Sequence, residues 1–200
     1  MKIVLLSAVA LATTIAAPAF AANYTYGANN DGIGTYPVTA NVDNFCKLGT
    51  VSAAAGNHTS VDGSFATGDA NVHVALQDSN DQAQAWSQTL SIDNSICNHS
   101  FKISMSSDNG SLKNSVGRPR GDQGANFINA VNYSIQVSFG GASSRAVAAS
   151  DLNAAGQSLL TGDPAVGSLS IALNGAAVTN GYLLAGTFSD TLRMTLQPNI

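Results

Sequence analysis

The chain has 200 residues, of which only 10% are charged, and its formal net charge at pH 7 is −4. This length suggests one domain with a sizeable core. With 8 Lys and Arg against 12 Asp and Glu, no clustered basic surface is expected, which argues against nucleic-acid binding. The Ser-, Thr-, Asn- and Gly-rich composition favours strands and turns over helices.

The N-terminal residues have the pattern of a secretory signal peptide. Lys2 precedes an apolar run over residues 3–17, and an A-x-A cleavage site ends at Ala21. The run is too short for a typical membrane anchor. We therefore expect residues 1–21 to be removed on export, and we exclude them from the expected fold.

Alternating apolar and polar residues predict a series of β-strands. Turn signals such as Asn-Gly at 174–175 and 180–181 separate them. Many short strands of this kind predict an all-β sandwich or barrel. Residues 143–160 are Ala-rich without a clear apolar stripe, so they could be partly helical or a decorated loop. The expected strands, in chain order, are 36–42, 71–76, 86–92, 101–105, 131–139, 168–173 and 187–196.

Two cysteines, Cys46 and Cys97, are present. In an exported protein an even number of cysteines indicates a disulfide, and two cysteines allow one intramolecular pairing. No C-x-x-C or Cys/His spacing suggests a metal site instead. The sequence predicts a structural Cys46–Cys97 bridge that closes a loop of about 50 residues.

We find no pattern that indicates catalysis. The three histidines are scattered, and His73 alternates with valines on a strand whose other face is predicted to be apolar. No motif for a nucleophile, a nucleotide, a metal or another cofactor is present. Asp78 and Asp81 are better explained by turn chemistry than by calcium binding. The tripeptide Arg120-Gly121-Asp122 is most simply a solvated turn. We expect no enzyme activity and no cofactor.

Three segments together resemble one known family. The first is V-x-A-x-V-x-x-x-C, which begins at Val38 and ends at Cys46, and the second is the hairpin-like SICNHSFKISMSSDNG around Cys97. The third is a closing strand of the form G-x-[YF]-x-D-T-[VL]-x-[VM]-T-[VL]. It is matched at Gly186, Phe188, Asp190, Thr191, Leu192, Met194, Thr195 and Leu196. These segments resemble the spore coat protein U domain family, which includes the subunits of archaic (Csu-type) chaperone–usher pili.

The resemblance implies an immunoglobulin-like β-sandwich that lacks its last strand. A periplasmic chaperone would fill the open groove first, and an N-terminal segment of the next subunit would then insert as a donor strand. The implied domains are a signal peptide at 1–21, a donor segment at 22–44 and a sandwich at 45–200. The resemblance implies that one wall of the acceptor groove is formed by Phe188, Leu192, Met194 and Leu196.

The preferred donor residues alternate as an inserting strand must: Tyr36, Val38, Ala40 and Val42. An earlier register through Tyr24 and Tyr26 would leave 36–42 as the subunit's own first strand, and the sequence does not choose between these registers. The expected partners are related subunits joined head to tail, with the chaperone and an outer-membrane usher in transit.

The expected function is that of a structural pilus subunit at the cell surface, which serves attachment or biofilm formation. The alternative is a secreted coat or matrix protein, or an adhesin module, with the same fold. The long region 123–160 could present a binding loop in that case.

Overall fold

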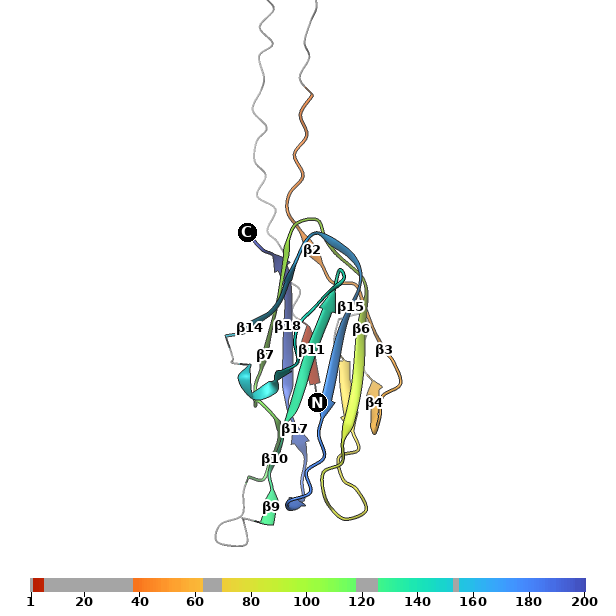
Figure 1. Cartoon of the computed structure of the whole chain (residues 1–200), viewed down its shortest axis with the longest axis vertical. Helices are drawn as coiled ribbons and strands as arrows, with labels where there is room; N and C mark the ends of the chain where they lie inside the picture. The colour runs from red at the N-terminus through yellow and green to blue at the C-terminus, as the bar shows by residue number, and fades with distance from the viewer. Residues whose placement is uncertain (1, 6–37, 63–69, 118–125, 153–154) are drawn as a thin grey trace, which may run out of the picture. The chain divides into compact units, whose positions relative to one another are not determined.

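The structure is a computed structural model that describes residues 2–5, 38–62, 70–117, 126–152 and 155–200 (Figure 1). The chain divides into two compact units, residues 1–8 with 44–200 and residues 9–43. In the second unit only residues 38–43 are described, and they are exposed and without regular secondary structure. The described part of the first unit is all-β apart from 3-10 turns, of which η3 (Ala149–Asp151) is described in full. The all-β prediction is therefore confirmed.

A six-stranded sheet contains the C-terminal strand. Its order is β14 (Gln157–Gly162), β7 (Phe101–Ser107), β18 (Thr191–Pro198), β1 (Lys2–Leu5), β5 (Ala70–Val74) and β4 (Thr59–Asp62). Strand β18 runs antiparallel to β7 and parallel to β1, and β1 runs antiparallel to β5.

A seven-stranded sheet forms the second layer. Its main path is β12 (Ala142–Ser143), β11 (Tyr133–Phe139), β15 (Ala165–Gly175), β6 (Trp86–Cys97) and β2 (Cys46–Lys47). Beside this path, β13 (Val147–Ala148) pairs with β11, and β3 (Thr50–Ala53) pairs with β6. The long β6–β15 pairing has a register shift between Gly167 and Leu169.

The core is made of apolar side chains from both sheets. Alternate residues are buried along β6, β11, β15 and β18, as a strand with one core-facing side requires. The rings of Phe101 on β7 and Phe139 on β11 meet edge to face, with centroids 4.9 Å apart, and so join the two sheets. This arrangement is consistent with a β-sandwich.

Five short strands complete the fold. One three-stranded sheet has the order β10 (Ala130–Val131), β8 (Leu112–Asn114) and β17 (Phe188–Ser189). The other two strands, β16 (Tyr182–Leu183) and β9 (Phe127–Ile128), pair in parallel.

Most of the expected strands are present, and two of them are divided. The stretch 131–139 is interrupted at Asn132, and the stretch 187–196 is interrupted at Asp190. Residues 143–160 are not substantially helical where they are described. They form η3 and short strands instead, because β14 pairs with the edge of β7 and Ala149 is buried in the core.

The predicted disulfide is confirmed between Cys46 and Cys97, which are 51 positions apart in the sequence. It joins β2 to the end of β6, where the two cysteines are also register partners. Such a bond is typical of proteins outside the reducing cytoplasm. No described residue is a free cysteine.

Replacing both cysteines by serine should lower the free energy of unfolding by about 4 kcal/mol, because the unfolded chain would no longer be closed into a loop. Urea unfolding of the oxidised chain and the double variant would measure this difference. The parent chain under reducing conditions is the control and should match the variant. A variant as stable as the oxidised parent would contradict a stabilising role for the bond.

Candidate functional site

The candidate site is the C-terminal strand β18 and the strand position beside it. Leu192 and Met194 are completely buried, and Leu196 is nearly so. Phe188, the fourth residue expected in the acceptor wall, lies on β17 instead of β18, where it pairs with β8. It packs against the core and also lines a surface cavity. The structure thus groups three of these residues on one strand.

Strand β18 is hydrogen-bonded on both edges. One edge pairs with β7 over seven residue pairs, from Leu192 opposite Ser107 to Pro198 opposite Phe101. The other edge pairs with β1 over four, from Lys2 opposite Thr191 to Leu5 opposite Met194. The neighbour on this second edge therefore comes from the first five residues of the chain.

Strand β1 is the link between two parts of the six-stranded sheet. It also pairs with β5, through Lys2 opposite Asn71 and Ile3 opposite Ala70. Among the described strands, no direct pairing joins β18 to β5. The position that β1 occupies is therefore one strand wide. Without a strand there, β14, β7 and β18 would be separated from β5 and β4. We call it the β18–β5 position.

An occupant of this position needs a backbone that can pair on both sides. Ala70 and Val72 on β5 and Leu192 and Met194 on β18 are all buried, so the two flanking strands face the core. If the position were empty, the edges of β18 and β5 would have unpaired N–H and C=O groups beside buried apolar side chains. This combination favours pairing with another strand.

The residues predicted to act as a donor strand are exposed where they are described. Val38 is 93% exposed and Val42 is 73% exposed, and Ala40 between them is exposed as well. Tyr36 lies outside the described residues. Residues 38–42 do not form a strand of the subunit's own sheets.

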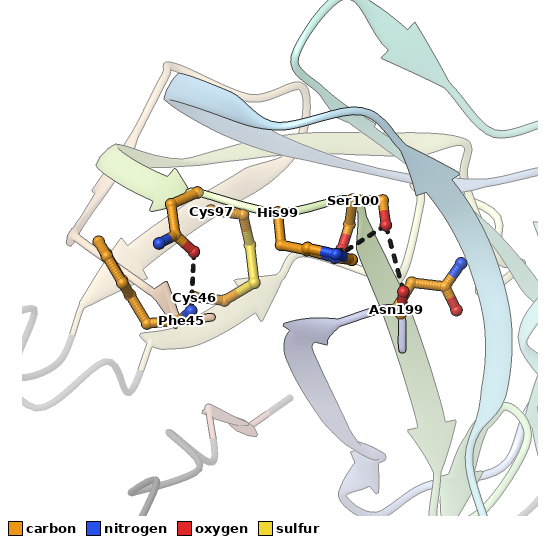
Figure 2. Close-up of a disulfide and its surroundings, with 7 residues drawn as sticks. Phe45, Cys46, Cys97, His99, Ser100 and Asn199 are labelled. Carbon is orange, nitrogen blue, oxygen red and sulfur yellow. Dashed lines mark hydrogen bonds between the residues drawn. A yellow bond between two sulfur atoms is a disulfide. The ribbon is translucent and has the colours of Figure 1, made fainter. Parts of the chain in front are cut away.

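The disulfide fixes the point at which this segment joins the domain. The Phe45 N–H donates to the Asn98 side-chain oxygen at 2.8 Å, and the Asn98 N–H donates to the Phe45 carbonyl at 3.2 Å. Figure 2 shows Phe45 beside the Cys46–Cys97 bond. Ser100 and Asn199 are joined by two further hydrogen bonds, of 2.8 and 3.1 Å. The start of the domain and the end of the chain are therefore anchored to the same short segment between β6 and β7.

A buried carboxylate anchors the start of β18. Asp190 is 1% exposed, and its Oδ2 atom accepts hydrogen bonds from the hydroxyls of Tyr133 and Ser107, both at 2.6 Å. Its Oδ1 atom accepts from the backbone N–H groups of Asn109 at 3.0 Å and Thr191 at 2.7 Å. Four donors satisfy the buried charge, as burial of a carboxylate requires.

This network joins the two layers of the fold. Tyr133 lies on β11 in the seven-stranded sheet, whereas Ser107 lies on β7 in the six-stranded sheet. Burial, followed by the hydrogen bond and the negative charge of Asp190, raises the pKa of the Tyr133 hydroxyl above its ordinary value. The hydroxyl therefore stays protonated and remains a donor. The Asp of the closing sequence motif thus has a structural role, since it fixes where β18 begins.

The other sequence candidates take ordinary structural roles where they are described. His73 lies on the exposed face of β5 and pairs with Asp62 at 3.0 Å. Asp78 accepts hydrogen bonds from the N–H groups of Gln82 and Asn80, which lower the pKa of its carboxyl group, and this is the hydrogen bonding expected of a turn. The tripeptide that begins at Arg120 lies outside the described residues.

The described residues contain no candidate metal site and no candidate membrane span. No cluster of three or more His, Cys, Asp or Glu side chains there could hold a metal ion. No helix in the same residues is long and apolar enough to cross a membrane.

Sequence reasoning missed two features of the site. The pairing of Lys2–Leu5 is not expected from the sequence, because these residues have the pattern of a signal peptide and are excluded from the expected fold. The contact between Tyr133 and Asp190 is not expected either, because the two residues are 57 positions apart. The one feature of the sequence that points to this contact is Asp190 itself, a single acidic residue between the apolar residues Phe188 and Leu192 of the closing motif.

Replacing Tyr133 by phenylalanine should reduce stability in a pH-dependent way. At neutral pH the loss should be about 2 kcal/mol, because Asp190 loses one donor to a buried charge. The raised pKa of Tyr133 contributes its full stabilisation of the folded state at any pH below about 10, the ordinary pKa of tyrosine. As the pH rises above it, only the unfolded chain ionises, so this stabilisation falls by about 1.4 kcal/mol per pH unit. The difference between parent and variant should therefore shrink over that range.

Urea unfolding followed by Trp86 fluorescence would measure this, since the Trp86 and Tyr133 ring centroids are 5.7 Å apart. Ser134→Ala, an exposed-side neighbour on the same strand, is the matched control. A difference between parent and Tyr133→Phe that stays constant from about pH 8 to pH 11 would contradict the assigned role.

Comparisons with known proteins do not assign the chain to a family. No protein-family model, no curated protein and no solved structure matches the chain. The function is therefore inferred from the residues, the sequence resemblance and the geometry around β18.

Proposed function

We propose that this protein is a structural subunit of an extracellular chaperone–usher pilus and that it polymerises by donor-strand exchange. The observation that carries the proposal is the β18–β5 position. It lies inside a sheet, it is one strand wide, and it holds residues 2–5. Those residues belong to the segment that the sequence predicts to be a cleaved signal peptide.

Removal of the signal peptide would leave this position open in the mature chain. The edge of β18 would then lose four register partners, and β5 would lose two. The apolar side chains of Leu192 and Met194 would border the gap. A strand from another molecule could restore both the hydrogen bonds and the burial, which is the physical basis of β-augmentation.

The segment proposed as donor is residues 36–42 of a second copy. Its apolar residues alternate, and those that are described are exposed. It is joined to its own domain at the disulfide-anchored segment, so a subunit could offer this strand while its own sheets stay intact. Insertion of one subunit's segment into the next subunit's sheet is a heterologous contact that does not close, and it therefore builds a fibre.

The remaining parts of the proposal follow from the sequence resemblance. A periplasmic chaperone would occupy the position before assembly, and an outer-membrane usher would pass subunits outward. The completed domain would have an immunoglobulin-like arrangement. The fibre would serve surface attachment or biofilm formation.

Expression of the chain in a bacterial periplasm with a candidate chaperone tests the proposal. Gel electrophoresis without reduction should show a ladder in unboiled samples that collapses to monomer on boiling. Changing Val38 and Val42 to Asp should abolish the ladder, because a charged side chain cannot enter the core without a partner. Val166→Asp is the matched control, since Val166 is 71% exposed and lies on β15. It should leave the ladder unchanged.

An extended variant supplies the strand within one molecule. Strand β18 ends at Pro198, close to the C-terminus, so a copy of residues 34–44 added after Ile200 through a flexible linker could turn back and pair antiparallel to β18, in the direction opposite to that of β1. This chain should be a heat-stable monomer that no longer forms a ladder. If instead the unaltered mature chain is a soluble, heat-stable monomer without a chaperone, the pilus proposal is wrong. A self-contained secreted binding or coat protein is then the better interpretation.

A further inference from the structure

A surface cavity of about 540 Å³ is lined by no residue of the strands that pair with β1. Its lining comes from β9, β16, β17, the loop residues 184–186 and residues 76, 77 and 81. The volume is in the range of small-molecule sites, and the lining combines mostly apolar and aromatic side chains with few polar ones, as such sites do. Its polar side-chain groups are the Gln77 amide, the Asp81 carboxylate and the Tyr182 hydroxyl, and the lining contains no Lys, Arg or His.

Three aromatic rings line this cavity, from Phe127, Tyr182 and Phe188. Phe127 and Tyr182 are register partners on β9 and β16, with ring centroids 6.5 Å apart and planes inclined by 52°. Tyr182 is 51% exposed although it is a large aromatic residue. A compact group lying between the tilted rings could contact both of them within the roughly 6 Å over which an aromatic face attracts a cation. A flat ligand would stack on only one ring.

A carboxylate is held at the same cavity. The Gln77 side-chain amide donates a hydrogen bond to Asp81 Oδ1. The backbone of Asp81 lies beside the strand that carries Tyr182, because the Leu183 N–H donates to the Asp81 carbonyl at 2.8 Å and Leu183 is adjacent to Tyr182. The described residues provide no cation to pair with Asp81.

The loop between β16 and β17 is also held in place. The Asn114 amide donates to the carbonyl of Leu184 at 3.0 Å and to that of Ala185 at 3.4 Å. Both of these loop residues line the cavity. The backbone around the cavity is therefore held by hydrogen bonds in the free protein, which lowers the entropic cost of binding.

We propose that this cavity binds a quaternary ammonium group of the choline type. Aromatic faces and one carboxylate both favour a positive charge. The apolar lining suits the methyl groups of such a cation, whereas a primary ammonium is strongly hydrated and would lose more on leaving water. The site is distinct from the β18–β5 position, since none of its strands pairs with β1, and it shares only Phe188 with the residues expected in the acceptor wall.

The test compares choline chloride with 3,3-dimethyl-1-butanol, a neutral compound of almost the same shape, by saturation-transfer NMR titration of the full chain. Choline should show saturable binding at least about fivefold tighter than the neutral compound, the ratio expected of one cation–π contact. Asp81→Asn should weaken choline binding and leave binding of the neutral compound unchanged. Tyr182→Leu keeps apolar bulk and removes the aromatic face, so it should weaken choline more than the neutral compound.

Val166→Ala, an exposed change elsewhere, is the control and should alter neither titration, and circular dichroism would check the fold of each variant. Equal binding of the two compounds would overturn the proposal, because the cavity would then recognise only apolar shape. The absence of saturable choline binding, or binding that is insensitive to both Asp81→Asn and Tyr182→Leu, would also overturn it. So would preferential binding of methyl glucoside, which would indicate a site for neutral sugars.

Discussion

Strand β18 needs a hydrogen-bonding partner on each of its edges, and the rest of the fold depends on how this need is met. Its Leu192 and Met194 side chains are buried in the core, and β7 satisfies only one edge. On the other edge β5 is one strand too far away to pair directly, so a further strand must lie between them. The strand in the β18–β5 position therefore has two roles. It keeps the six-stranded sheet continuous, and it covers this part of the core.

Both ends of β18 are fixed independently of that occupant. At its start, Asp190 is bonded to side chains from both layers of the fold. Past its other end, Asn199 is bonded to Ser100, three residues beyond the disulfide at Cys97. A strand whose ends are held in this way presents an ordered edge, so a pairing segment would lose mainly its own conformational freedom on binding.

The sequence was most informative where a strand is long and has one face on the core. Alternation identified β6, β7, β11, β15 and β18, because a period of two is imposed by burial of one side. The cysteine count identified the disulfide. The two-residue strands β9 and β16, which line the cavity, were not predicted, since such segments are too short to show a period.

Contacts between distant residues were the other limit. The aromatic pair of Phe127 and Tyr182 arises from parallel pairing of two short strands 55 positions apart. No local sequence pattern predicts this pairing. The same holds for Tyr133 and Asp190. Residues 2–5 were a different case, because their composition suggested a leader-like segment while their backbone can also pair as a strand.

The disulfide has a mechanical consequence. A pull on the segment before Asn44 reaches the domain at Cys46 and passes directly to Cys97, so it bypasses the polypeptide between the two cysteines. That polypeptide, with a sequence separation of 51, could extend to about 170 Å if it were free to unravel. With the bond intact this length is not released under tension. A molecule loaded through its N-terminal segment would therefore stay short until the strands beyond Cys97 separate.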